Sequence, residues 1–322
     1  MKKGIALLLS LILLVSAGLS LAEAPAVIRL GGLKGPTTMG LVQLLDSAEK
    51  GTTENKYEFT MAAAADELTP GLLKGELDIL AVPANLGSVL YNKSGGSVQA
   101  LAVNALGVLY VVEKGGETVQ SLKDLAGKTI YATGKGTTPE YVLTYLLSQH
   151  GLTLGQDVQV EWKSEPTEVV AQMATEETAV AMLPQPFVTV ASTQLEGLRT
   201  ALDLTAEWNA LENGSQLVTA ALIIRKAFAE EHPEEVKKFL SEYAASAAFA
   251  NEHPEDAAQL IEKYGIVKAP IAQKALPFCN IVCIEGAEME RILSGYLQVL
   301  FDQNPAAVGG AMPGADFFLK YE

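Results

Sequence analysis

Cysteine, histidine and basic residues are scarce in this chain. Among 322 residues there are 2 cysteines and 3 histidines, and 23 lysines and arginines stand against 38 aspartates and glutamates. Two cysteines are too few for a disulfide-stabilised scaffold. The formal net charge of −15 disfavours nucleic acid or an anionic membrane surface as a partner, because long-range repulsion opposes the encounter. With 49% hydrophobic residues, the chain is nevertheless long enough to form two domains.

The common catalytic and metal-binding motifs are also missing. The sequence has no Gly-x-Ser-x-Gly elbow, no Walker loop and no zinc-protease helix. His150 precedes a glycine at the expected end of a helix, and His232 and His253 each precede a proline at an expected helix start. None of the three has a partner at ligand spacing, so we expect no metal site. We expect no cofactor and no catalysis, because this inventory fits binding better than turnover.

The N-terminus has the pattern of a signal peptide. Two lysines precede an apolar run over residues 5–19, and small residues at Ser20 and Ala22 fit cleavage before Glu23. A membrane anchor is the alternative, although the run is short for a span. No cysteine near the cleavage region can carry a lipid. We therefore expect removal of residues 1–22 and export, without a lipid anchor, to the periplasm or the extracellular face of the cytoplasmic membrane.

Two strand-to-helix junctions share one pattern, in which a strand is followed by Lys-Gly, by two threonines and by a helix. The first junction contains Gly35, Thr37 and Thr38, and the second contains Gly136, Thr137 and Thr138. Threonine suits a helix N-cap, and a helix start presents unpaired N–H groups and the positive end of the helix dipole. The two helix starts are therefore candidates to hold one polar or anionic ligand across a cleft. A purely structural role for each junction is the alternative.

Strand and helix signals alternate over the first two thirds of the chain. Strands are expected over 28–33, 57–61, 77–82, 99–104, 107–112, 128–132, 158–162, 178–183 and 218–225, with helices between many of them and a helical region from there to the end. This alternation implies largely parallel sheets with helices on both faces. The middle of the chain repeats the order of the first part, from the glycine–threonine helix start to a proline turn. Because ligands bind at the carboxyl ends of such strands, Pro83, Ala84 and Asn85 are expected beside the first glycine–threonine junction.

Cys279 and Cys283 are the only cysteines. An exported protein offers an oxidising environment in which they can pair. Two buried free thiols are the alternative, because the short spacing is tight for disulfide geometry.

In their order along the chain, these motifs resemble the ABC-transporter substrate-binding proteins of the nitrate/sulfonate/taurine and pyrimidine-precursor class. Besides the signal peptide, the residues that carry the resemblance are 33–38, 78–85, 122–128, 134–141, 183–187 and 228–234. The resemblance implies a type II periplasmic-binding-protein fold, which is an α/β fold of two lobes, each a mostly parallel sheet flanked by helices. It also implies a double crossover hinge near 107–116 and 217–224. Lobe one is then expected to combine 24–109 with 221–322, and lobe two to span 110–220.

The resemblance further implies that the two lobes close around a small molecule and deliver it to an ABC permease in the cytoplasmic membrane. The residues expected to bind this ligand are Gly35, Thr37, Thr38, Pro83, Ala84, Asn85, Asn104, Gly136, Thr137, Thr138, Trp162, Gln185 and Pro186. A core role is the alternative for Trp162. We expect a monomer, with no nucleic-acid partner. The chain departs from many relatives in lacking a lipobox.

The ligand and the class of function each keep an alternative. Two helix starts favour a sulfonate, a carboxylate or another oxyanion, whereas the absence of arginine from both junctions leaves a neutral heterocycle open. An enzyme on the same fold, of the pyrimidine- or menaquinone-pathway type, is the main rival. The signal peptide and the scarcity of histidine and cysteine disfavour that rival. A binding protein that feeds a sensor is a third reading.

Overall fold

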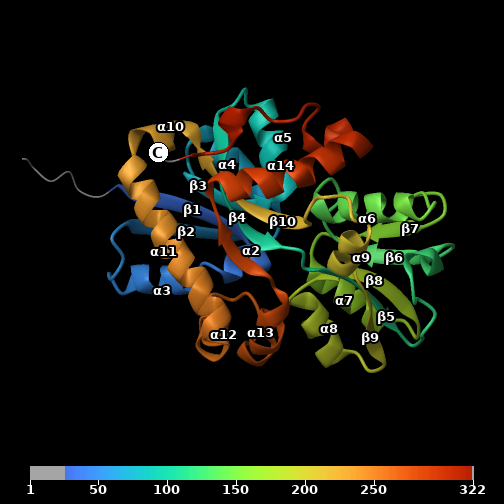
Figure 1. Ribbon diagram of the computed structural model, residues 1–322. Helices are drawn as coiled ribbons and strands as arrows, with labels where there is room; N and C mark the ends of the chain where they lie inside the picture. The colour runs from blue at the N-terminus through green and yellow to red at the C-terminus, as the bar shows by residue number, and fades with distance from the viewer. Residues whose placement is uncertain (1–25, 321–322) are drawn as a thin grey trace, which may run out of the picture.

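The computed structural model describes residues 26–320, which form two α/β lobes, each built around one sheet (Figure 1). We refer to the first sheet and its helices as lobe one, and to the second sheet and its helices as lobe two. The expected signal peptide, residues 1–22, lies outside the described residues. Within residues 26–320, none of the helices has the length and apolar character needed to cross a bilayer.

Lobe one contains a six-stranded sheet in the order β11-β4-β10-β3-β1-β2. Its strands are β1 (Val27–Leu33), β2 (Lys56–Ala62), β3 (Ile79–Pro83), β4 (Val98–Leu106), β10 (Val218–Arg225) and β11 (Ile281–Ile284). The first four run in one direction, and β10 and β11 run in the other. Four of the six strands are therefore parallel, as expected, but β10 lies between β3 and β4 and is antiparallel to both.

Lobe two contains a five-stranded sheet in the order β7-β6-β8-β5-β9. Its strands are β5 (Leu109–Lys114), β6 (Thr129–Ala132), β7 (Gln159–Trp162), β8 (Ala179–Pro184) and β9 (Leu198–Asp203). Only β5 runs against the others among these strands. The order β8-β6-β7 repeats the order β3-β1-β2 of lobe one, with the same parallel pairing. The repeat expected from the sequence is thus a repeat of topology.

Helices cover both faces of each sheet (Figure 1). Those of lobe one are α2 (Pro36–Met39), α3 (Val42–Glu49), α4 (Thr69–Lys74), α5 (Ala84–Lys93), α10 (Lys226–Glu231), α11 (Pro233–Glu252), α12 (Pro254–Lys263), α13 (Ala269–Ala275) and α14 (Gly286–Gln303). Those of lobe two are α6 (Thr138–Gln149), α7 (Pro166–Ala174), α8 (Phe187–Gln194) and α9 (Leu204–Ala210). His232 and His253 are the N-caps of α11 and α12, and His150 is the C-cap of α6, which confirms the helix-end interpretation of all three histidines.

The central strands of the lobe-one sheet are apolar on both faces, so their side chains contribute to two hydrophobic cores, one on each side of the sheet. In β3, Ile79 and Ala81 pack with α3 and α11, whereas Leu80 and Val82 point to the opposite face, where α5 and α14 lie. This follows from the alternation of side chains along a strand. The second of these cores continues into lobe two, where it includes Leu143 of α6. The lobes are therefore joined by shared apolar packing as well as by the chain itself.

The chain passes between the sheets twice. It leaves lobe one between the end of β4 and the start of β5, through Gly107, and it returns between α9 and β10. A Cβ on Gly107 would collide with the Thr205 hydroxyl at the start of α9, and it would lie 3.0 Å from Leu217 Cδ2 in the segment that returns the chain. The two crossings therefore touch each other, which only a glycine permits at this point.

Two strands differ from the sequence-based expectation. The region after residue 225 was expected to be helical to the end, but Ile281–Ile284 forms β11 at the sheet edge. β9, over Leu198–Asp203, was also not expected. Both are short edge strands, and polar residues interrupt the apolar residues of β9. The hydrophobic pattern that identifies a strand in the sequence is therefore weak in both.

Both cysteines are free thiols. Cys279 is buried in the core of lobe one, where its Sγ lies 3.9 Å from Met39 Sδ. Burial raises the pKa of the Cys279 thiol, and burial followed by the charge of Glu285 raises the pKa of Cys283 to about 12. The two free thiols match the second alternative left open by the sequence, except that Cys283 is only partly buried.

Candidate functional site

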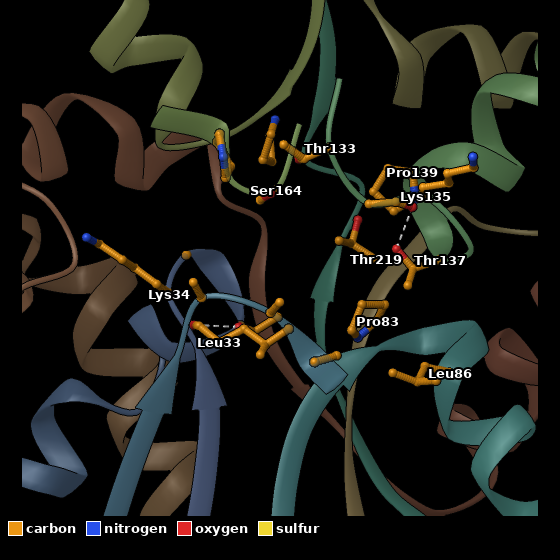
Figure 2. A pocket seen from close by; sticks show the side chains of 18 of the residues that line it. Leu33, Lys34, Pro83, Leu86, Thr133, Lys135, Thr137, Pro139, Ser164 and Thr219 are labelled. Carbon is orange, nitrogen blue, oxygen red and sulfur yellow. Dashed lines mark hydrogen bonds between the residues drawn. The ribbon is translucent and has the colours of Figure 1, made fainter. Parts of the chain in front are cut away.

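A cavity of about 490 Å³ lies between the two lobes (Figure 2). In lobe one it is bordered by the residues that follow β1 and β2, by the last residue of β3, and by Thr219 of β10. In lobe two it is bordered by the residues that follow β6 and β7 and by the last residue of β8. The cavity thus lies at the carboxyl ends of three parallel strands from each lobe, the place where α/β sheets bind ligands.

The structure divides the expected ligand-binding residues into two groups. Those that line the cavity are Gly35, Thr37, Pro83 and Thr137. Those that do not line it are Thr38, Ala84, Asn85, Asn104, Gly136, Thr138, Trp162, Gln185 and Pro186. In the second group, Thr38 and Asn104 hold the first turn in place, and Thr138 and Asn85 form a buried contact between the lobes.

The turn between β1 and α2 is held by its own threonines. The hydroxyls of Thr37 and Thr38 both donate to the carbonyl of Leu33, at 2.9 and 2.6 Å. From below, Asn104 Nδ2 donates to the carbonyl of Thr37 at 2.9 Å, and Asn104 is only 1% exposed. Gly35 has a φ of 149° with no atom close to its missing side chain, so it serves the turn conformation and not a close approach. Asn104 is therefore placed to support Thr37 and not to touch a ligand.

The turn between β6 and α6 carries its own carboxylate. Glu140, in the first turn of α6, reaches back and accepts from the N–H of Gly136 at 2.5 Å. The Thr137 hydroxyl donates to the carbonyl of Gly134 at 2.8 Å. A carboxylate at this position is the usual partner of a helix start. The N–H of Gly136, which the sequence suggested for a ligand, is thus occupied by a residue of the same turn.

A buried hydrogen bond links the lobes beneath the cavity. The hydroxyl of Thr138, at the start of α6, donates to Asn85 Oδ1 of α5 at 3.3 Å. Asn85 Nδ2 in turn donates to the carbonyl of Ala307 at 2.9 Å. Thr138 and Asn85 are both fully buried. The two residues therefore set the contact between α5 and α6 and present no polar group to the cavity.

The remaining residues expected to bind the ligand make contacts within the protein instead. Gln185 accepts from the backbone N–H and the hydroxyl of Thr189, and Pro186 is the N-cap residue of α8. Ala84 is fully buried at the start of α5. Trp162 lies on the edge strand β7 and packs against the core, in line with the alternative given for it.

Charged and hydroxyl side chains of the cavity were missed in the sequence. The lining includes three lysines and one aspartate, which are Lys34, Lys135, Lys163 and Asp66. The hydroxyls of Thr133, Ser164 and Thr219 also line it. Lys34 and Lys135 each stand directly before the glycine of their junction. The Lys-Gly pair that occurs in both junctions could therefore have indicated these two lysines as cavity residues.

The cavity is electropositive within an acidic protein. Its three lysines outnumber its one aspartate, whereas the whole chain carries −15. The ammonium groups of Lys34 and Lys135 make no ion pair with other described residues, whereas Lys163 Nζ lies 3.4 Å from Glu161. Aromatic side chains and arginine do not occur among the residues that line the cavity. This arrangement suits a small anion, held by ammonium groups and hydroxyls.

Within residues 26–320 there is no cluster of three or more histidine, cysteine, aspartate or glutamate side chains arranged to hold a metal ion.

Solved structures of similar fold come from several bacteria. An ABC transporter from Parabacteroides distasonis matches 92% of this chain and 99% of its own, with a TM-score of 0.75 and 23% identity. The periplasmic aliphatic sulphonate binding protein SsuA from Escherichia coli matches 93% and 94%, with a TM-score of 0.72 and 18% identity. The periplasmic nitrate-binding protein NrtA from Synechocystis PCC 6803 matches 82% and 74%, with a TM-score of 0.62 and 14% identity. These likenesses show a common fold.

No curated protein matches the sequence. A family model, however, described as NMT1/THI5 like, matches residues 65–257, which is more than half of the chain. The resemblance inferred from the order of motifs is thereby confirmed at the level of family and fold. The chain belongs to the NMT1/THI5-like family.

Proposed function

We propose that this chain is an exported solute-binding protein that captures a small anion between its two lobes and delivers it to an ABC importer. The observation that carries the proposal is the cavity between the lobes, in which three lysines stand in an otherwise acidic protein. Two proteins of similar fold are named as binding proteins for aliphatic sulphonates and for nitrate, which supports this class of ligand.

The proposed ligand contacts come from both lobes. Lys34, Gly35 and Thr37 act from lobe one, and Lys135 and Thr137 act from lobe two. Contacts from both sides stabilise the closed arrangement only when a ligand is present, which is the physical basis of closure on binding. The volume of about 490 Å³ suits a small molecule.

A neutral aromatic heterocycle is a weaker candidate for the ligand. Binding such a ring favours an aromatic side chain to stack on, and none lines the cavity. An unpaired ammonium group, by contrast, gains most from a negative partner in a partly enclosed site. Of the two ligand classes that the sequence left open, an oxyanion and a neutral heterocycle, we therefore propose the oxyanion.

Capture without turnover is part of the proposal. Beside leucine, alanine, proline and glycine, the residues that line the cavity are lysine, aspartate, threonine and serine, without a histidine or cysteine among them. The proposed partner is the permease of an ABC importer, and the proposed state is a monomer in the periplasm or at the extracellular face of the cytoplasmic membrane. The lobes are proposed to divide near the two crossings between the sheets.

The test is a titration of the full chain, expressed with its own N-terminus and recovered after export. Nitrate, methanesulfonate, taurine and acetate serve as anionic probes, and a neutral aminopyrimidine serves as the uncharged one. We expect an anion to bind and to raise the unfolding midpoint, by about 2.7 kcal/mol of stability at a hundredfold excess over its dissociation constant. The double variant Lys34→Met, Lys135→Met should weaken that binding by about tenfold to a hundredfold.

Lysines outside the cavity supply the matched control. Lys93 on α5 and Lys123 of lobe two are exposed, so Lys93→Met, Lys123→Met makes the same change of charge with one substitution per lobe. This control should bind the anion as the wild type does. Equal losses in both double variants would show that net charge and not the cavity governs binding. Conversion of a probe into product would favour the enzyme alternative.

A further inference from the structure

A β-bulge sets one threonine apart from the rest of the crossing strand β10. Val218 pairs with Leu106 of β4, and Ala220 pairs with the adjacent Ala105, so Thr219 has no residue opposite it. A bulge bends its strand and redirects the side chain of the extra residue, and bulges are frequent beside functional sites. Thr219 is also the one polar residue in an otherwise apolar run from Val218 to Ile224.

The hydroxyl of Thr219 has no partner. The residue is only 8% exposed, and its oxygen accepts or donates no hydrogen bond among the described residues. Thr219 lines the cavity, and Figure 2 shows its oxygen projecting into the space between the lobes. An unpaired buried hydroxyl disfavours folding, because the group has lost its hydrogen bonds to water. Folding alone therefore does not account for a threonine at this place.

We propose that Thr219 is a specificity-determining residue of the cavity, whose hydroxyl donates a hydrogen bond to an anionic oxygen of the bound ligand. The inference rests on the proposed function and adds a contact at the floor of the same site. Lys34 and Lys135 border the cavity from opposite lobes, and Figure 2 shows their side chains extending away from each other, whereas Thr219 lies between them at the start of β10, the strand that returns the chain to lobe one. A hydrogen bond to a charged acceptor is among the stronger ones, so the loss of this contact is measurable.

Thr219→Val is the direct test, because valine keeps the branched shape and removes only the hydroxyl. If the hydroxyl acts on the ligand, affinity for the anion that the wild type binds best among nitrate, methanesulfonate, taurine and acetate falls about tenfold to a hundredfold. The unfolding midpoint of the empty protein stays the same or rises, because the variant leaves no polar group unpaired. If the Thr219 hydroxyl instead bonded to another group of the protein, the empty Thr219→Val variant would have a lower unfolding midpoint than the wild type. Thr219→Ser restores a hydroxyl and should recover most of the affinity.

Thr205 provides a control of the same chemistry. Its hydroxyl oxygen is also buried without a partner, but Thr205 does not line the cavity. Thr205→Val should therefore bind the anion with unchanged affinity. The inference is overturned if Thr219→Val binds as the wild type does while Lys34→Met, Lys135→Met does not, and in that case the proposed function stands. It is also overturned if the empty Thr219→Val protein melts several degrees lower. If the wild type binds none of the four anions, the proposed function and this inference fall together.

Discussion

Two adjacent threonines, which look equivalent in the sequence, are expected to respond differently to the same substitution. Thr137 lines the cavity, and its hydroxyl donates to the carbonyl of Gly134, which also accepts the backbone N–H of Thr137. Thr138 is fully buried, and its hydroxyl is the donor to Asn85 Oδ1 across the lobe boundary. Valine at either position preserves the shape and removes the hydroxyl. The two variants therefore separate a cavity role from a structural role.

The structure sets the size of each effect. In Thr138→Val, Asn85 Oδ1 is left buried without a donor, which costs about 1–3 kcal/mol. The original bond of 3.3 Å is long, so the lower part of that range, about 1–2 kcal/mol, is expected. At about 2–4 °C per kcal/mol, which applies to chains of 150–250 residues, the midpoint should fall by about 2–8 °C. In Thr137→Val the Gly134 carbonyl keeps its backbone donor, so the change should stay within about 0.5 kcal/mol.

Thermal unfolding of the empty protein and titration with the best anionic probe give the two readouts. Thr138→Val should melt lower, and Thr137→Val should melt with the wild type. Thr137→Val should also bind the probe up to about tenfold more weakly, because on binding the Thr137 hydroxyl turns from the Gly134 carbonyl, which keeps the Thr137 N–H, to the anion. The reasoning fails if Thr138→Val melts with the wild type while Thr137→Val loses several degrees. It also fails if Thr137→Val binds the probe as tightly as the wild type.

Two buried carboxylates lead to further predictions. The carboxylate of Asp78 is fully buried and accepts hydrogen bonds from Arg29 at 2.8 and 2.6 Å and from Arg225 at 2.7 Å. Asp78→Ala should therefore lower the free energy of unfolding, measured in urea, by about 3 kcal/mol. A decrease of less than about 1 kcal/mol would contradict this role. Burial opposes the charge of Glu113, but hydrogen bonds from the segment after β5 and from Arg199 lower its pKa to about 2. Because this pKa is depressed in the folded state, Glu113 contributes about 2–3 kcal/mol above pH 4.5, and that contribution is lost as the pH falls from 4.5 to 2. Urea unfolding should therefore show wild type and Glu113→Gln further apart at pH 7 than at pH 3, and an equal separation would contradict the assignment.

The alternation of strands and helices predicted α/β sheets covered by helices on both faces, and the resemblance to the transporter-binding proteins implied the two lobes. Long apolar runs such as 77–82 and 218–225 identify buried strands without ambiguity, because both faces of each sheet are covered. β9 and β11 escaped this reasoning, since edge strands bury one face or less and their register comes from the neighbouring strand. The disulfide alternative arose at the same place, because Cys279 precedes β11 and Cys283 lies within it.

The sequence predicted the turns that border the candidate cavity, but it did not predict most of the side chains that line it. Gly35, Thr37 and Thr137 lie where the junction pattern placed them, on the rims of the cavity. The pattern cannot tell which of two adjacent threonines faces inward, because that depends on the angle at which each helix leaves its strand. Thr219 was overlooked because β10 is apolar apart from it, although a single hydroxyl within a fully buried strand is itself a signal.

The two helix starts carry less of the anion recognition than the sequence suggested. α2 has only four residues, so its dipole is small, and the start of α6 already holds the carboxylate of Glu140. A second anion beside that carboxylate would meet repulsion that the helix dipole alone does not offset. Under the proposed function, the positive charge that selects the anion therefore comes from side chains, and the lysines that precede the two glycines border the cavity, one from each lobe. The repeated topology explains why the same residue type recurs at the same step of both turns, since β1 and β6 hold equivalent positions in their sheets and end at facing rims.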